Sequence, residues 1–355
     1  MKMGFRWFGS ADDPIPLAYI RQIPGVTQIV GALFDVPVGE TWTSERIGGL
    51  KAEVEAAGLS LEVIESVNIH DAIKIGLPER DRYIENYIAT IENLAGHGIK
   101  VICYNFMPVF DWVRTDLRYE LPDGSHVLAL DNAMLQGSAD ELLARVQESA
   151  GEFVLPGWEA DRLADVRSLF EAYSEVDEDT LAANMEYFIT AIMPACERFD
   201  VRMAVHPDDP PWPLFGLPRI VKNAEDLRRI ESFHDSPYNG FTLCTGSLGE
   251  NPDNDVPAIL REFIGKGKAP FVHARNILHT GPGQFHESAH LSSEGSLDMY
   301  EVMRALAESG FDGYVRPDHG RDIWGERGRP GYGLHDRALG IAYLNGLWEA
   351  ITKAG

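Results

Sequence analysis

Four side chains that can bind a transition metal stand at the ends of β-rich segments. His206 ends VRMAVH, Cys244 ends FTLC, His273 lies in PFVHAR, and Asp318 ends GYVRPD. Imidazole, thiolate and carboxylate together suit Mn, Fe, Co or Zn better than Mg or Ca, which prefer shells of oxygen. If the ends of these segments meet at one edge of a sheet, the four residues can share one divalent ion. The ligand types leave the choice among Mn, Fe and Zn open.

Two further residues are suited to acid–base chemistry beside that predicted metal. His319 directly follows Asp318, and Tyr332 lies in the segment GRPGYG. Consecutive residues at a strand end point in different directions, so we expect His319 to transfer protons rather than to bind the metal. Gly331 and Gly333 on either side of Tyr332 would let the backbone bring the phenol close to a substrate.

Several other polar or aromatic residues are candidate substrate contacts, because they follow predicted strands or the ligands themselves. They are Arg275, Asn276, His286, Glu287, Trp7 and Asn105. An arginine beside a ligand can hold an anionic substrate through paired hydrogen bonds. His286, Glu287 and the neighbouring His290 could equally belong to an exposed polar loop.

Other residues near the predicted ligands have simpler interpretations. We interpret Asp208 and Asp209, in HPDDPP, first as turn formers and second as carboxylates that support the metal ligands. Cys103 lies inside the apolar run VICYNF, and Cys196 lies on the apolar stripe of a predicted helix. We therefore assign both cysteines to the core.

The elements that must position these residues alternate between β-rich runs and segments with helical periodicity. Eight such runs occur: FRWF from Phe5, VTQIV from Val26, LEVIES from Leu61, VICYNF from Val101, VRMAVH from Val201, FTLC from Phe241, PFVHAR from Pro270 and GYVRPD from Gly313. This alternation predicts a (β/α)8 TIM barrel, one α/β domain over residues 1–355. The first run leads into GSADDPIP, which lacks the glycine-rich turn typical of a doubly wound dinucleotide-binding sheet.

The helical segments show apolar residues at a spacing of three and four. One stripe runs from Ile84 to Leu94, with Gly98 predicted as the stop signal. In the segment from Met185 to Cys196, Pro194 is expected to kink or interrupt the helix. Ser296 is the predicted N-cap of the helix that contains Met299, Val302, Met303 and Leu306, and the last helix holds Ile341, Leu344, Trp348 and Ile351.

The alternation breaks once, between residues 108 and 180. About 70 residues separate the fourth strand from its helix, whereas such loops usually have about 2 to 6. The segment opens with PVFDWVRTDLRYELPDG and continues with acidic stretches such as ADELLARVQESAGEF, which predict helices. We expect a helical insertion that acts as a lid over the barrel mouth, since loops after strands emerge on the catalytic face.

Composition excludes several other classes of protein. The chain has 31 Lys and Arg against 55 Asp and Glu, a net charge of −24 that disfavours nucleic acids and anionic membranes. Three unpaired cysteines indicate a reducing compartment, and Asp12 and Asp13 precede any signal-peptide core. We expect a cytoplasmic protein with a small-molecule substrate. The exposed helices of a barrel also favour a homo-oligomer.

Eight strings together resemble the mannonate dehydratase family, whose barrel is of the xylose-isomerase-like type. They are CYNFMPVFDW, MAVHPDDPP, GLPRIV, NGFTLCTGS, FHESAHL, DMYEVM, RPDHG and PGYG. The resemblance spans nearly the whole chain and is weakest between about residues 124 and 180. It implies a hydro-lyase of hexuronate catabolism that converts D-mannonate into 2-dehydro-3-deoxy-D-gluconate with one Mn2+ or Fe2+ per chain.

Carried over residue by residue, the resemblance implies metal ligands at His206, Cys244, His273 and Asp318. It implies an acid–base pair at His319 and Tyr332, without saying which residue is the base. Two alternatives stay open on the residues alone: a metal-dependent sugar isomerase or epimerase, and a multi-zinc hydrolase of DNA phosphodiesters. The single cysteine ligand and the net charge weigh against the hydrolase.

Overall fold

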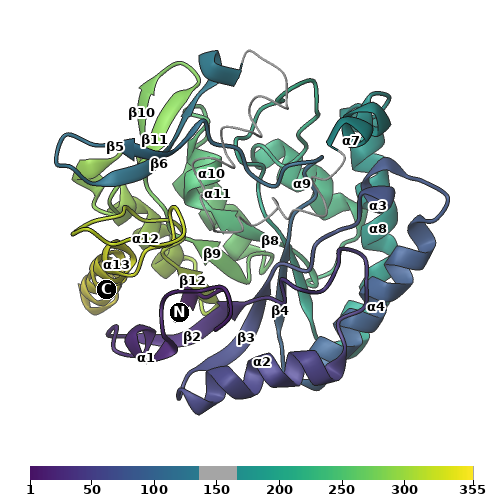
Figure 1. Ribbon diagram of the computed structural model, residues 1–355, viewed down its shortest axis with the longest axis horizontal. Helices are drawn as coiled ribbons and strands as arrows, with labels where there is room; N and C mark the ends of the chain where they lie inside the picture. Colours follow the sequence, from purple (N-terminus) through teal and green to yellow (C-terminus); the bar gives the residue numbers. More distant parts are fainter. Residues whose placement is uncertain (136–165, 355) are drawn as a thin grey trace.

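A closed barrel of parallel strands forms the centre of the molecule (Figure 1). The computed structural model describes residues 1–135 and 166–354. Around the barrel the strand order is β1, β12, β9, β8, β7, β4, β3 and β2, so neighbours in the ring follow the order of the chain. The predicted (β/α)8 TIM barrel is therefore confirmed.

Each of the eight predicted runs overlaps one barrel strand, and their bounds differ by at most three residues. The strands are β1 (Lys2–Arg6), β2 (Val26–Gly31), β3 (Ser60–Glu65), β4 (Val101–Tyr104), β7 (Arg202–Val205), β8 (Asn239–Cys244), β9 (Phe271–His273) and β12 (Tyr314–Arg316). Cys244 and His273 are the last residues of their strands, whereas His206 and Asp318 follow theirs. This places the candidate site residues at the carboxyl edge of the barrel.

Helices pack around the barrel strands. They are α1 (Leu17–Ile20), α2 (Ser44–Ala56), α3 (Asp71–Ile75), α4 (Arg80–Gly96), α7 (Val166–Tyr173), α8 (Glu178–Phe199), α9 (Ala224–Phe233), α10 (Thr245–Gly249), α11 (Val256–Gly265), α12 (Met299–Glu308) and α13 (His335–Ala354), with 3-10 turns η1 (Asn132–Leu135) and η2 (Ser292–Glu294). No helix in residues 1–135 and 166–354 is long and apolar enough to cross a membrane.

Two local predictions about helix ends are wrong. Pro194 was expected to kink or interrupt its helix, but α8 is not interrupted there and continues to Phe199, with Pro194 exposed while its neighbours are buried on the core-facing side. The N-cap of α12 is Asp298, whose carboxylate accepts hydrogen bonds from the backbone N–H groups of Tyr300 and Glu301. The hydroxyl of Ser296 instead accepts a hydrogen bond from the backbone of His279.

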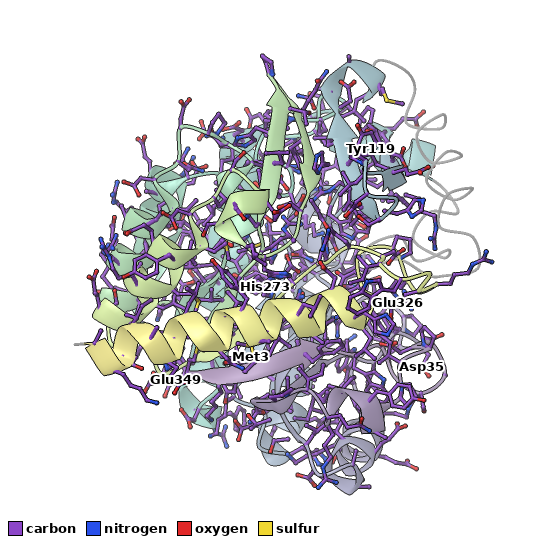
Figure 2. The ribbon with its side chains drawn as sticks, turned by 90° about the vertical axis from the view of Figure 1, so that its left-hand side faces the viewer. Met3, Asp35, Tyr119, His273, Glu326 and Glu349 are labelled. Carbon is purple, nitrogen blue, oxygen red and sulfur yellow. The ribbon has the colours of Figure 1, made fainter. Side chains whose placement is uncertain are left out.

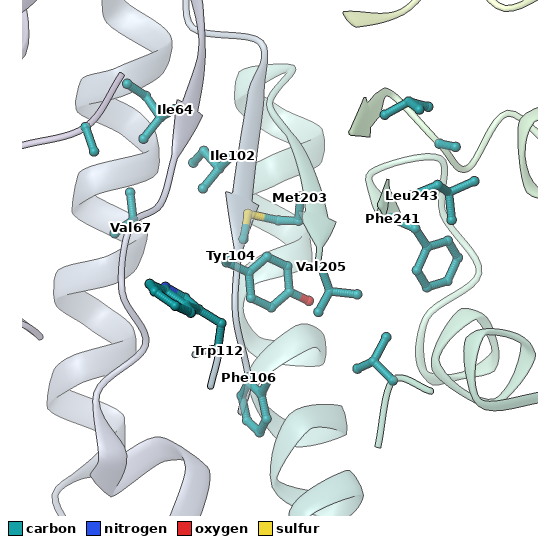
Figure 3. Close-up of a cluster of buried hydrophobic side chains, with 14 of the residues drawn as sticks. Ile64, Val67, Ile102, Tyr104, Phe106, Trp112, Met203, Val205, Phe241 and Leu243 are labelled. Atoms are coloured by element: carbon teal, nitrogen blue, oxygen red, sulfur yellow. The ribbon is translucent and has the colours of Figure 1, made fainter. Parts of the chain in front are cut away.

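Side chains of the barrel strands alternate between two apolar layers. In β4, Val101 and Cys103 belong to a cluster inside the barrel, which also contains Val30, Val63, Ala204, Phe271 and Tyr314. Ile102 and Tyr104 belong instead to the large core between strands and helices (Figure 3). Cys103 and Cys196 are both buried, as a core assignment requires.

The insertion after β4 is not wholly helical, which corrects part of the prediction. Its first part forms β5 (Asp116–Glu120) and β6 (His126–Asp131), which join β10 (Ile277–Gly281) and β11 (Gln284–Glu287) in an antiparallel sheet. The stretch ADELLARVQESAGEF lies outside the described residues. Because the two hairpins follow β4 and β9, the small sheet stands over the carboxyl ends of the strands (Figure 1).

The carboxyl edge of the barrel lies at one end of the molecule. In Figure 2, Asp35, Tyr119 and Glu326 lie at the right-hand end, and Glu349, near the end of α13, lies at the opposite end. His273 appears between them, at the end of β9.

Candidate active site

Three of the four predicted metal ligands converge at the carboxyl edge of the barrel. Cys244 and His273 end neighbouring strands and are paired in register between β8 and β9. His206 follows β7, where its backbone N–H donates to the carbonyl of Tyr104 at 2.9 Å. One ligand atom of each of His206, Cys244 and His273 lies within 4.8 Å of the other two.

The two histidines turn one ring nitrogen each toward the other. His206 Nδ1 lies 2.7 Å from the carbonyl oxygen of Pro207, so we assign the proton to Nδ1 and leave Nε2 bare. His273 Nε2 faces the Glu65 carboxylate at 3.3 Å, so the proton is assigned there and Nδ1 is bare. The bare atoms, His206 Nε2 and His273 Nδ1, are 3.1 Å apart. Two lone pairs at this distance favour a cation between them.

The fourth predicted ligand, Asp318, reaches the same cluster. Its Oδ2 lies 3.4 Å from Cys244 Sγ, and its Oδ1 lies 3.8 Å from His273 Nδ1. Asp318 has a backbone φ of 57°, a conformation that costs energy in a residue other than glycine and that often occurs at functional sites. We call His206, Cys244, His273 and Asp318 the ligand cluster.

The ligand cluster fits a divalent ion. Adjacent ligands with bonds of about 2.0 to 2.3 Å lie roughly 3.0 to 3.6 Å apart. The distances of 3.1 Å between the imidazoles and 3.4 Å between Cys244 and Asp318 fall within this range. Burial opposes ionisation of Asp318, but Arg316 and other cationic groups hold its pKa well below its usual range, so the carboxylate is charged as a ligand must be.

A second group with metal-binding atoms shares His273. It consists of Glu65, Cys103 and His273. Both Glu65 oxygens, however, accept hydrogen bonds from Arg316, at 3.0 and 2.7 Å. Burial raises the pKa of the Cys103 thiol well above its usual range, which disfavours the thiolate that a metal needs. The ligand cluster is therefore the better metal site.

The predicted proton-transfer residues are in direct contact. His319 Nε2 lies 2.9 Å from the hydroxyl of Tyr332. His319 Nδ1 lies 2.6 Å from Glu287 Oε1, so the ring donates its Nδ1 proton to that carboxylate and leaves Nε2 able to accept a proton. Glu287, predicted as a substrate contact, thus orients the imidazole instead.

Burial determines the protonation of Tyr332. The phenol is enclosed by protein, and burial raises its pKa above the ordinary value even though Arg316 and Arg6 oppose this effect. Tyr332 is therefore a neutral phenol at neutral pH, and it can donate its proton to His319 Nε2. As a base, Tyr332 would instead need a lowered pKa.

Arg275 is surrounded by carboxylates of the protein. Its Nη1 donates to Glu287 Oε1 at 2.9 Å, and its Nη2 donates to Asp209 Oδ2 at 2.8 Å. Nη2 also lies 3.1 Å from Glu250 Oε1, and Nε lies 3.3 Å from Asp318 Oδ2. These contacts favour a structural role for Arg275 between the ligand cluster and Glu287 over the predicted contact with a substrate.

Sequence reasoning missed a buried ionic network behind the site. Arg114, in the insertion, pairs with Asp209, and it donates to Glu250 Oε1 and Glu287 Oε1 at 3.1 Å each. We call Arg114, Arg275, Asp209, Glu250 and Glu287 the ionic network. Each of these residues is buried. Neither Arg114 nor Glu250 directly follows a predicted barrel strand, so their positions in the sequence did not mark them as site residues. The sequence carries no other signal for them.

Two acids of the ionic network, Asp209 and Glu250, have pKa values shifted in opposite directions. Burial opposes ionisation of Asp209, but Arg114 and Arg275 hold its pKa well below the usual range. Burial raises the pKa of Glu250 well above its usual range, and the Asp209 charge adds to this effect. Asp209 is thus an ionised partner of both arginines rather than only a turn former. Asp208 accepts hydrogen bonds from the backbone N–H groups of Ile220 and Val221 at 2.7 Å each.

The remaining predicted substrate contacts divide between three environments. The Trp7 indole N–H donates to the carbonyl of Ile15 at 3.1 Å, and the Asn276 amide holds the backbone of Ile277, Leu291 and Leu297. His286 stacks on Tyr119 and lines a hollow on the small sheet. Asn105 lines a different cavity, which Tyr332 also lines.

A cavity of about 290 Å³ opens beside Tyr332. Tyr332, Asn105, Glu65 and Arg6 line it together with the loop after β2. A small substrate that enters this cavity would lie next to Tyr332.

Comparison with known proteins places the chain in a family. The family model described as D-mannonate dehydratase (UxuA) matches residues 1–355. A mannonate dehydratase of Thermotoga neapolitana is 58% identical over 354 residues, covering 99% of this chain and 98% of the relative. One of Lactococcus lactis subsp. lactis is 59% identical over 355 residues, covering 99% of each chain.

A solved structure agrees with these matches. The crystal structure of mannonate dehydratase from Streptococcus suis serotype 2 superposes with a TM-score of 0.90 at 45% identity, covering 100% of this chain and 95% of that one. The resemblance inferred from the eight sequence strings is thereby confirmed. The chain belongs to the D-mannonate dehydratase family.

Proposed function

We propose that this protein removes water from D-mannonate to give 2-dehydro-3-deoxy-D-gluconate, as a carbon–oxygen hydro-lyase. The full-length match to the D-mannonate dehydratase family carries the proposal. The geometry of the site supplies residues for each part of the reaction. The isomerase and DNA hydrolase alternatives lose their support, because high identity over the whole chain points to the dehydratases.

The reaction has two demands that the protein must meet. A weakly acidic proton leaves carbon 2, beside the carboxylate, and the hydroxyl on carbon 3 leaves with a proton. Negative charge therefore develops next to a group that is already anionic. A nearby base, a nearby acid and a stabilising cation together meet these demands.

The ligand cluster would hold one divalent ion per chain through His206, Cys244, His273 and Asp318. Mn2+ or Fe2+ is the proposed metal, in accord with the mixed nitrogen, sulfur and oxygen donors. Such an ion supplies Lewis-acid stabilisation of the negative charge that develops beside the substrate carboxylate.

His319 is the proposed base and Tyr332 the proposed acid. The hydrogen bond from Nδ1 to Glu287 leaves His319 Nε2 as the ring atom that accepts a proton from carbon 2. The neutral phenol of Tyr332 then gives its proton to the leaving hydroxyl of carbon 3. Glu287 and Arg275 hold the imidazole in the orientation that this transfer needs.

Residues 108–180 form the proposed cover of the site within a single domain of residues 1–355. Two contacts support this role: Arg114 joins the ionic network, and the Trp112 ring lies 6.1 Å from the His319 ring, centroid to centroid. A cover that excludes water strengthens electrostatic interactions inside the site. The homo-oligomer and the cytoplasmic location stay predictions.

The substrate proposal is tested with a panel of aldonates and hexoses. We expect D-mannonate, and no simple hexose, to yield a 2-keto-3-deoxy acid, detected by its keto group. A chelator should abolish turnover, and Mn2+ or Fe2+ should restore it, since the ligand cluster supplies the cation. Interconversion of an aldose and a ketose without loss of water would favour the isomerase alternative.

The metal site is tested by removing single ligands. Changing residues that only support metal ligands costs about 10- to 100-fold in affinity, so Cys244→Ser or His273→Ala should lower metal content at least as much. Metal analysis of the folded variants measures the effect. Cys103→Ser is the matched control and should keep the wild-type stoichiometry. Loss of metal from Cys103→Ser but not from Cys244→Ser would move the ion to the second group.

The proton-transfer pair is tested with His319→Asn and Tyr332→Phe. Each variant should keep its metal and fold but lose about 100-fold or more in turnover, the usual contribution of a general acid or base. With substrate deuterated at carbon 2, His319→Asn should slow deuterium removal and Tyr332→Phe should still allow it.

Two outcomes would contradict the assigned roles. Near-wild-type turnover in both metal-loaded variants would exclude the pair and make His286, Glu287 and His290 the next candidates. Loss of deuterium removal in Tyr332→Phe alone would reverse the base and the acid.

A further inference from the structure

Arg6 is a buried cation that lacks an acidic partner in contact. It ends β1 and is 2% exposed. Its Nη1 donates to the carbonyl oxygens of Val30 at 3.2 Å and Trp7 at 3.4 Å. Within residues 1–135 and 166–354, no ion pair within 4.0 Å includes Arg6, whereas Arg275, Arg114 and Arg316 each have such pairs.

Arg275, Arg114 and Arg316 have their guanidinium groups against carboxylates of the protein. A substrate carboxylate could bind them only by displacing these partners, which would leave buried carboxylates uncompensated. Arg6 has no such partner to displace. Burial lowers the pKa of Arg6, and the Glu65 charge, farther away than an ion pair, opposes that effect.

Two aromatic rings hold the Arg6 side chain in place. Its guanidinium carbon lies 4.6 Å from the centroid of Phe8 and 5.2 Å from that of Phe34. The Phe8 ring also packs edge-on against Tyr332, with centroids 4.9 Å apart. Phe8 thus contacts both Arg6 and the proposed acid. Because the guanidinium is already held against the rings, it loses less conformational freedom when an anion binds.

The cavity gives Arg6 access to a ligand. Arg6 is the only lysine or arginine among the described residues that line this cavity, and Tyr332 and Asn105 line it too. A ligand that places an anionic group on Arg6 therefore lies beside Tyr332. In a sugar acid the carboxylate adjoins carbon 2 and is two bonds from carbon 3, so both reacting atoms would stay close to the carboxylate.

We propose that the guanidinium of Arg6 binds the carboxylate of the sugar-acid substrate and so fixes the acid end of the substrate beside Tyr332. This inference rests on the proposed function for the class of substrate. Arg6 is then a specificity-determining residue, because it separates sugar acids from neutral sugars and alditols. Arg275 keeps the positioning role that its contacts indicate.

The test compares two ligands that differ at one group, D-gluconate and D-gluconamide. Calorimetry measures their binding to the metal-loaded wild type, Arg6→Met and Arg6→Lys. Arg6→Met should weaken the affinity for D-gluconate by about 10- to 100-fold, the scale of a hydrogen bond between charged groups. It should change the affinity for D-gluconamide by less than about threefold. Arg6→Lys should restore part of the preference for the acid, because it keeps the charge without the planar fork.

Arg329→Met is the matched control. Arg329 also stacks on Phe8, with its guanidinium carbon 4.0 Å from the ring centroid, but it does not line the cavity. This variant should keep the wild-type ratio of the two affinities. Should Arg6→Met not fold, Arg6→Gln replaces it, since the amide can still donate to the Val30 carbonyl and carries no charge.

A structural role for Arg6 predicts a different result. Equal weakening of both ligands in Arg6→Met or Arg6→Gln, with the ratio of affinities unchanged, would overturn the proposal. Because binding is measured without turnover, this outcome leaves the test with D-mannonate unaffected. A wild type that binds neither ligand but dehydrates D-mannonate would also overturn the inference while the proposed function stands.

Discussion

Most buried charges near the barrel mouth are paired with opposite charges, and this pairing determines the arrangement of the site. Arg114 and Arg275 lie between Asp209, Glu250 and Glu287, all shielded from water. Removing one partner from a buried ion pair typically costs about 3 to 5 kcal/mol, because the other charge stays behind without compensation. The ionic network therefore admits few alternative arrangements. Glu287 of the network orients His319, and Arg275 lies against Asp318 next to Cys244, so the geometry of the candidate active site depends on this pairing.

The network also explains how segments far apart in the sequence form one site. Parallel strands bring the ligand cluster to one edge, but strands alone do not orient a side chain on the loop that follows them. The insertion contributes Arg114, and the β10–β11 hairpin contributes Glu287, so the small sheet is joined to the barrel through charge pairs. Arg6 differs from these residues in lacking a carboxylate in contact. That difference is why the structure favours Arg6 as the group that meets a substrate anion.

The sequence predicted those features that follow from local periodicity and strand ends. The eight strands are in their expected places, and His206, Cys244 and His273 converge because each ends or directly follows a strand of a parallel barrel. Features decided by long-range pairing were missed: the strands β5 and β6 in the insertion, and the partners of Arg114 and Arg275. Local signals also misled where packing overrode them. Pro194 does not end its helix, because buried residues on either side anchor α8.

The tautomers assigned from these contacts and the charge of Asp318 favour one metal site at the ligand cluster. Crystals of the protein grown with Mn2+, with diffraction recorded on both sides of the manganese absorption edge, would locate the ion. We expect one anomalous peak per chain, within about 2.0 to 2.4 Å of His206 Nε2, Cys244 Sγ, His273 Nδ1 and an Asp318 oxygen. A peak bound instead between Glu65, Cys103 and His273 Nε2 would contradict it.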